Sequence, residues 1–125
     1  MSAIVQQTDE WLKLRKTKIG ASDAPVIMGV SPWATPFKRW QEKMGIISQP
    51  NSTPRMKQGL IKEEEAREFF SNEFGLLFNP LVMFHPENNF MMASLDGITR
   101  DKKNAVEIKN PGMEDHLLAK NGLIP

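Results

Sequence analysis

The 125-residue chain contains no cysteine and only two histidines. The absence of cysteine excludes disulfides, thiolate zinc sites and cysteine-ligated iron–sulfur clusters. His85 and His116 alone could supply imidazole. We expect His85 to be a turn residue and His116 a surface residue.

A strong net charge and long apolar runs are also absent. The formal net charge is +1, so any DNA binding would need a local basic patch. No apolar run is long enough for a membrane span, and residues 1–7 lack the pattern of a signal peptide. With 40% hydrophobic and 25% charged residues, the sequence predicts one soluble cytoplasmic domain of modest core, or part of a larger one.

Helix signals begin near the N-terminus. A helix is expected over residues 10–16, and a second one from Ser22, as N-cap, to Gly29, as stop. The N-terminus of the second helix offers free N–H groups and partial positive charge, so with the Ser22 hydroxyl and the Arg15 guanidinium it could hold a phosphate. On these residues alone, the simpler alternative is that Ser22 only caps the helix and Arg15 lies on a solvated surface.

A third helix is predicted to start at Thr35 and Pro36 and to stop at Gly45. Three apolar residues recur on one of its faces, and we expect them in the core rather than in a base-stacking platform: Phe37, Trp40 and Met44. Residues 46–54, rich in Ser, Pro and Asn, are predicted to form a mobile loop.

A long helix is expected over residues 55–74, ended by Gly75. Its apolar arc carries a carboxylate, Glu63, in the middle, between Gly59 and the residues Ala66, Phe70 and Phe74. Because an unpaired buried carboxylate is costly, Glu63 needs a partner. That partner is either a metal site, or an arginine or backbone group.

Strands are expected over residues 76–85, 90–98 and 105–108, with Pro80 at an irregular or edge position and a turn over residues 99–104. In the last strand Glu107 and Lys109 share one face. Asp96, at the end of the preceding strand, can lie across from Glu107. Two carboxylates and an ammonium would then converge at one edge of the sheet.

This combination is costly unless a cation lies between the carboxylates. A hard ion such as Mg²⁺ suits oxygen ligands, and Asp96, Glu107 and the backbone carbonyl of Ile108 could supply them, with Glu63 reaching the ion or its water shell. Lys109 could then orient or help deprotonate a water for phosphodiester hydrolysis. The alternative is a surface hairpin with an ordinary cross-strand ion pair.

Several blocks, taken in order, point to one known family: Arg15, Ile19-Gly20-Ala21-Ser22-Asp23-Ala24, Ser31-Pro32-Trp33, the helix with Gly59 and Glu63, His85-Pro86, Ala93-Ser94-Leu95-Asp96-Gly97 and Glu107-Ile108-Lys109-Asn110-Pro111. The chain resembles the YqaJ-type viral recombinases, which are similar to phage lambda exonuclease and belong to the PD-(D/E)XK nuclease superfamily. The resemblance implies an exonuclease, dependent on Mg²⁺ or Mn²⁺, that degrades linear duplex DNA from 5′ ends for recombination.

By position in this resemblance, Asp96 and Glu107 match the metal-binding acids and Lys109 the catalytic lysine. Glu63 matches the helix glutamate, and Arg15 and Ser22 match the residues that grip the 5′-phosphate. Two departures, Leu95 for proline and Asn110 for cysteine, lie outside this set. A single-strand annealing protein is a possible partner, in a bacterial or phage-infected cell.

The expected fold is α+β and restriction-endonuclease-like, with a small, mostly antiparallel sheet, N-terminal helices packed on it and an incomplete core. We expect one partial nuclease domain over residues 1–125, with a helical part (1–54), a catalytic helix and three-stranded core (55–111) and the start of a further helical segment (112–125). Since the family's later helices and strands do not follow Pro111, the chain is expected to be a fragment.

The fragment leaves three hypotheses open. The first is the nuclease, which could form a homo-oligomeric ring only with its C-terminal part. The second is a non-catalytic remnant that binds DNA ends or another protein. The third is a structural or adaptor domain whose carboxylates only form ion pairs.

Overall fold

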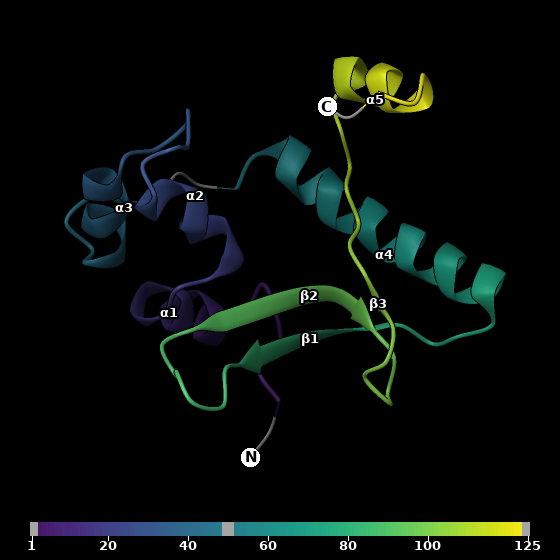
Figure 1. Ribbon diagram of the computed structural model, residues 1–125, viewed down its shortest axis with the longest axis horizontal. Coiled ribbons are helices and arrows are strands. Elements are labelled where there is room, and N and C mark those ends of the chain that lie inside the picture. Colours follow the sequence, from purple (N-terminus) through teal and green to yellow (C-terminus); the bar gives the residue numbers. More distant parts are fainter. Residues whose placement is uncertain (1–2, 49–51, 124–125) are drawn as a thin grey trace.

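The computed structural model describes residues 3–48 and 52–123. Over these residues the fold is α+β, as predicted, with helices around a small antiparallel sheet (Figure 1). The elements follow in the order α1 (Asp9–Thr17), the 3-10 turn η1 (Ala21–Asp23), α2 (Ala24–Ile27), α3 (Pro36–Lys43), α4 (Pro54–Phe74), β1 (Asn79–Phe84), β2 (Met92–Ile98), β3 (Ala105–Val106) and α5 (Met113–Lys120).

Local residues set several of the helix ends. The Thr8 hydroxyl accepts a hydrogen bond from the backbone N–H of Trp11, and the Thr35 hydroxyl accepts one from Lys38. Gly75 ends α4 in the left-handed region, at φ +64°, where glycine carries no side-chain penalty. The predicted start of α3 and end of α4 are confirmed.

The sheet has the order β1-β2-β3, and both pairs are antiparallel. Its register shifts between Asn79 and Leu81, so Pro80 lies at the irregular position that the sequence predicts. The third strand is shorter than predicted, because only Ala105 and Val106 pair with β2. Glu107 and Lys109 therefore follow the strand rather than lie within it.

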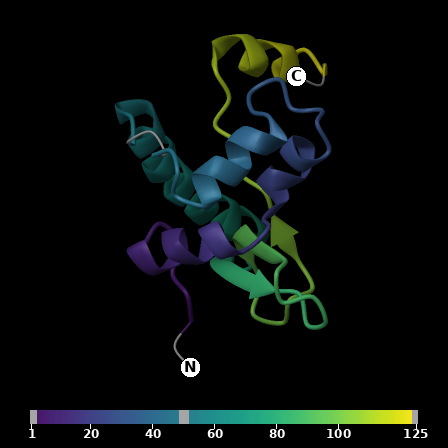
Figure 2. The ribbon, with the colours of Figure 1, turned by 90° about the vertical axis from the view of Figure 1, so that its left-hand side faces the viewer.

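The core is small. Among the described residues, the buried hydrophobic side chains are Trp11, Val26, Phe78 and Met92. The N-terminal helices gather at one end of the sheet, and α4 runs past the other (Figures 1 and 2). The Trp11 indole donates a hydrogen bond of 2.9 Å to Ser94 Oγ of β2, which joins α1 to the sheet. The core of the described residues is thus modest, as the sequence predicts.

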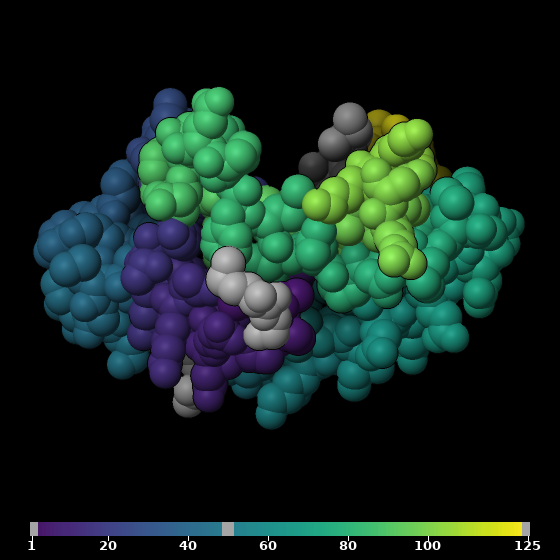
Figure 3. All heavy atoms as spheres, turned by 90° about the horizontal axis from the view of Figure 1, so that it is seen from below, coloured from purple at the N-terminus to yellow at the C-terminus, as the bar shows by residue number. Residues whose placement is uncertain are grey.

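The N-terminal segment also lies against the hairpin. The Gln6 amide donates to the backbone carbonyl of Leu95 at 2.9 Å and to that of Leu81 at 3.3 Å. In the space-filling view the purple N-terminal residues pack directly beneath the green residues of the hairpin (Figure 3). Segments far apart in the sequence therefore pack against each other.

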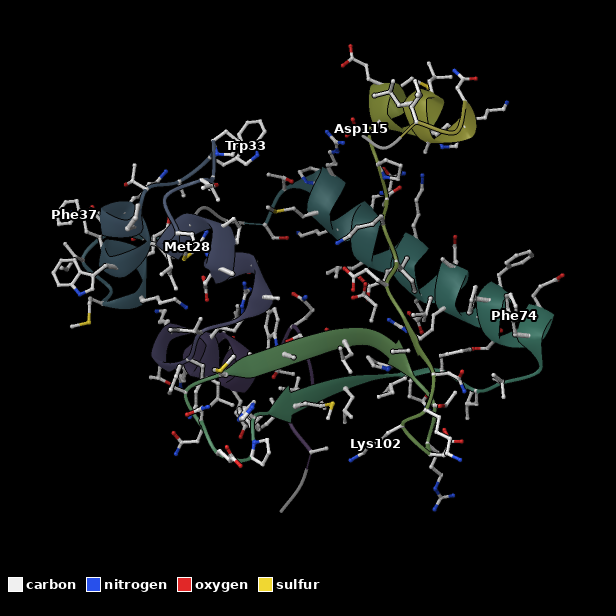
Figure 4. All side chains as sticks on the ribbon, viewed as in Figure 1. Met28, Trp33, Phe37, Phe74, Lys102 and Asp115 are labelled. Atoms are coloured by element: carbon white, nitrogen blue, oxygen red, sulfur yellow. The ribbon has the colours of Figure 1, made fainter. Side chains whose placement is uncertain are left out.

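The core role predicted for the apolar face of α3 is wrong. The three side chains of that face are exposed by 65%, 49% and 64%, namely Phe37, Trp40 and Met44. Phe37 points away from the rest of the molecule (Figure 4) and stacks only on Trp40, at 5.8 Å between ring centroids. The helix turns its charged face inward because Arg39 and Lys43 pair with the buried Asp23.

The helix cap predicted at Ser22 is also wrong. Ser22 lies within η1 and is exposed, and α2 begins two residues later, at Ala24. Asp23 Oδ2 accepts the N–H of Gly20 at 2.9 Å, so the carboxylate closes this turn in place of the hydroxyl. Of the predicted loop 46–54, residues 49–51 lie outside the described part of the chain.

Candidate active site

The two acids of the hairpin lie at the end of the β2–β3 pairing. The register pairs Gly97 with Val106, so the next residues outward are Asp96 and Glu107. Asp96 Oδ2 accepts a hydrogen bond of 2.8 Å from the backbone N–H of Ile108. This bond fixes the Asp96 carboxylate against the segment that carries Glu107.

Arg67 of α4 joins the helix glutamate to this edge. Its Nε donates to the backbone carbonyl of Asp96 at 2.6 Å, and its Nη2 pairs with Glu63 Oε1 at 2.8 Å. The Arg67 side chain is only 15% exposed. The sequence left two kinds of partner open for Glu63, a metal site or an arginine or backbone group. In the structure Glu63 pairs with an arginine, Arg67.

The three carboxylates are close enough to influence one another. Burial raises the pKa of Glu63, and the negative charges of Asp96 and then Glu107 raise it further, while Arg67 opposes the change. For Lys109, the hydrogen bond to Glu107 raises the pKa against the effect of burial. The charges of Glu107, Asp96 and Glu63 add to this rise. Electrostatically, these four residues form one cluster.

The pair formed by Glu107 and Lys109 lies in solvent. Lys109 Nζ and Glu107 Oε1 are 2.6 Å apart, and the side chains are 78% and 61% exposed. The predicted sharing of one face therefore holds although β3 ends at Val106. The ammonium is held beside the acids and is open to a large substrate.

The acids are not gathered at metal-ligand distance. Over residues 3–48 and 52–123, no three His, Cys, Asp or Glu side chains stand close enough to hold an ion. In the bonds described above, each carboxylate uses a single oxygen, toward Ile108, Arg67 or Lys109. The donor set suits a hard divalent cation, and such a cation would relieve the repulsion that raises the pKa of Glu63.

A cavity of about 850 Å³ lies between α1 and α4 and reaches one of the acids, Glu63. Its lining includes Arg15 from α1, Glu63 from α4 and Ile108. The Arg15 guanidinium lies over the Trp11 ring, 4.5 Å from the centroid. Ser22 does not line this cavity. The structure thus brings Arg15, and not Ser22, to the space beside the acids.

Several residues of this site were missed at the sequence level: Trp11, Lys57, Arg67 and Asn110. Arg67 could have been found, because it stands four residues after Glu63 on the same helix face. The cavity residues come from segments far apart in sequence, and no local pattern joins them.

Another acid of the hairpin, Asp101, is held within its own turn, where it accepts a hydrogen bond from Thr99 at 2.6 Å.

The fold is that of a known class of nuclease. A crystal structure of LHK-Exo in complex with dAMP matches this chain with a TM-score of 0.70 and 26% sequence identity. The match covers 92% of this chain and 60% of LHK-Exo. The chain therefore has the fold of the lambda-type exonucleases.

Sequence comparison identifies the family. The pattern of the YqaJ-like viral recombinase domain matches residues 10–124, and this chain belongs to that family. The uncharacterised protein YqaJ of Bacillus subtilis strain 168 is 34% identical over 104 residues, which are 81% of this chain and 33% of that protein. The resemblance drawn from the motifs is confirmed, and the chain spans about a third of YqaJ. Of the described helices, none has the length and apolarity to cross a bilayer.

Proposed function

We propose that this chain is the nuclease domain of a 5′–3′ exonuclease that acts on linear double-stranded DNA in phage-type recombination or end resection. The observation that carries the proposal is the set of contacts that holds Glu63, Asp96 and Glu107 at one edge of the sheet, with Lys109 paired to Glu107. The relative LHK-Exo was crystallised with dAMP, a nucleotide of the kind that DNA hydrolysis releases. The place of action would be the cytoplasm of a bacterial or phage-infected cell.

Asp96, Glu107 and the backbone carbonyl of Ile108 would hold a Mg²⁺ or Mn²⁺ ion, with Glu63 reaching it directly or through water. When bound, the ion would supply Lewis acidity and lower the pKa of a water. Glu63 would exchange its bond to Arg67 for this role. Arg67 would still hold Asp96 through the backbone carbonyl.

Lys109 would act as a cation. Because its neighbours raise its pKa, the amine stays protonated at neutral pH. An ammonium donates hydrogen bonds and accepts none, so it can orient a water and offset the charge that builds on the phosphate. This favours charge stabilisation over proton abstraction, which the sequence had left as an alternative for this lysine.

The DNA end would meet the basic end of α1. Arg15 would bind the terminal 5′-phosphate, with Ser22 supplying a hydroxyl from η1. Three further cations lie within the same stretch of sequence, Lys13, Lys16 and Lys18, and would add to the positive charge that a chain of net charge +1 needs locally for DNA. For the whole protein, the proposal also includes an annealing protein as partner and a ring of subunits.

The test is hydrolysis of a 5′-phosphorylated linear duplex with Mg²⁺. Glu107→Gln should lower the rate by about a hundredfold or more while DNA binding persists, since one preorganised charged group is lost. Glu64→Gln, an exposed neighbour on α4, is the matched control. Hydrolysis by Glu107→Gln at the unsubstituted rate would contradict the metal assignment.

A second readout does not depend on turnover. Mg²⁺ at about ten times its Kd should stabilise the chain by about 1.4 kcal/mol in thermal denaturation, because it binds only the folded state. Asp96→Asn should remove this stabilisation. An equal stabilisation of Asp96→Asn would place the ion elsewhere.

One observation favours a second function, a non-catalytic domain that binds DNA ends. Each acid of the site already has a partner within the chain, a backbone N–H for Asp96, Arg67 for Glu63 and Lys109 for Glu107. This alternative predicts binding of the 5′-phosphorylated duplex without turnover in Mg²⁺ or Mn²⁺. Assaying the chain beside a full-length family member would separate the two.

A further inference from the structure

The buried carboxylate of Asp23 organises the turn between α1 and α2. Its side chain is 5% exposed, and it accepts bonds from Gly20 N–H at 2.9 Å, Arg39 Nη1 at 2.5 Å and Lys43 Nζ at 2.9 Å. The proposed function does not use this cluster. Asp23 directly follows Ser22, which is proposed to meet the phosphate.

Lys43 extends the cluster to the end of α1. Its ammonium donates to the backbone carbonyls of Arg15, at 2.7 Å, and Lys18, at 2.8 Å. The carbonyl of Arg15 belongs to the last turn of the helix, where carbonyls have no partner within the helix and where a cation is favourable. With Asp23, these carbonyls occupy all three donors of the ammonium. Lys43 therefore joins α1, η1 and α3 at one atom.

The bonds of this cluster do not use the guanidinium of Arg15 or the hydroxyl of Ser22, the two groups proposed to bind the phosphate. Lys43 holds Arg15 by its backbone, so the guanidinium can lie over Trp11 and face the cavity. Arg39 and Lys43 also balance the charge of Asp23, which would otherwise repel a phosphate next to Ser22. The placement of Arg15 and the balanced charge of Asp23 therefore both favour the binding of a phosphate.

We propose that Lys43, anchored by Asp23, is a positioning residue that fixes the end of α1 against η1, so that Arg15 and Ser22 are set for a terminal 5′-phosphate. This inference rests on the proposed function, because it takes the 5′-phosphorylated DNA end as the ligand. Lys43 would thus support recognition of the phosphorylated end without contacting the phosphate.

The experiment measures binding rather than turnover. Two duplexes of one sequence, one with a 5′-phosphate and one with a 5′-hydroxyl, are titrated by fluorescence anisotropy in chelator, and the ratio of the two Kd values is the readout. Lys43→Met should lower the preference for the phosphate by about tenfold, the loss expected for one charge-assisted hydrogen bond. A general loss of protein stability would weaken the binding of both duplexes to the same extent and leave the ratio of the two Kd values unchanged.

Two further variants sharpen the test. Lys38→Met, an exposed lysine of the same helix, is the matched control and should keep the ratio. Lys43→Arg keeps the charge, but a guanidinium cannot bring one nitrogen to all three acceptors, so the ratio should fall by at least about threefold. This variant also provides the test if Lys43→Met does not fold.

An unchanged ratio in folded Lys43→Met or Lys43→Arg would overturn the inference. Equal binding of both duplexes by the unsubstituted chain would do the same. Absence of hydrolysis in Mg²⁺, with the preference and its loss in the variants intact, would count against the proposed function alone. The two proposals therefore fail in distinguishable ways.

Discussion

Replacing Arg67 by methionine, a shorter and uncharged side chain, should destabilise the fold because it removes the hydrogen-bond donors of the guanidinium. The bond from Nε to the Asp96 carbonyl, 2.6 Å long, is a hydrogen bond from a charged group and contributes about 1.5–3 kcal/mol. The ion pair with Glu63 adds less than about 1 kcal/mol, because the Glu63 side chain is 26% exposed. We expect a total loss of roughly 1.5–4 kcal/mol of unfolding free energy.

For a domain of this size, the loss corresponds to a fall of roughly 10 °C in Tm. Urea and thermal denaturation followed by circular dichroism would measure it, with Lys62→Met as the exposed control on the same helix. Adding Glu63→Gln to Arg67→Met should recover part of the loss, because the carboxylate no longer needs a cation.

The dependence on pH has a definite sign. Burial and the neighbouring acids raise the pKa of Glu63, so the folded state takes up a proton more readily than the unfolded state does. The difference in unfolding free energy between Arg67→Met and the unsubstituted chain should therefore shrink as the pH falls from neutral through that pKa. A variant as stable as the unsubstituted chain at neutral pH, within about 0.5 kcal/mol, would refute the reasoning.

Two further predictions concern stability. Gly97→Ala should cost about 1–3 kcal/mol, because an added Cβ would lie 2.7 Å from Val106 Cγ1. Gly59→Ala, inside α4, should gain about 0.5–1 kcal/mol, because an added Cβ would make an ordinary contact of 3.9 Å with Asn110 Nδ2. Urea denaturation of both variants checks this, and equal effects would contradict it. Burial raises the pKa of Asp23, but its bonds to Gly20, Lys43 and Arg39 outweigh burial and hold the pKa below 3.8. Stability should therefore fall as the pH drops below 3.8 through that lowered pKa, and Asp23→Asn should abolish this part of the acid titration.

Local chemistry explains what could be predicted. The starts of α1 and α3 follow from threonine caps, the end of α4 follows from a glycine, and the irregularity of β1 follows from Pro80. The hairpin that carries Asp96 and Glu107 follows from its alternating pattern and its turn, where Lys102 takes a positive φ of 59°. These features depend on residues a few positions apart.

The features that were wrong depend on distant partners. The face of α3 that packs is decided by Asp23, which lies 16 positions before Arg39 and pulls two cations inward. Since hydrophobic periodicity takes no account of such a carboxylate, it placed Phe37 in the core. The exposed ends of the elements carry other apolar groups, such as Phe74 at the end of α4 (Figure 4). The roles of the acids, of Arg15 and of Ser22 stay predictions.

The short segment after α1 also has a consequence for the order of folding. Ile19 exchanges backbone bonds with the hairpin, its N–H donating to Phe90 at 2.7 Å and its carbonyl accepting from Met92 at 2.9 Å. Some seventy residues separate these partners, so closing that loop carries an entropic cost before the contact forms. We expect the β1–β2 ribbon to be present in the rate-limiting step and the N-terminal helices to dock on it afterwards, with refolding slower than local helix contacts alone would give.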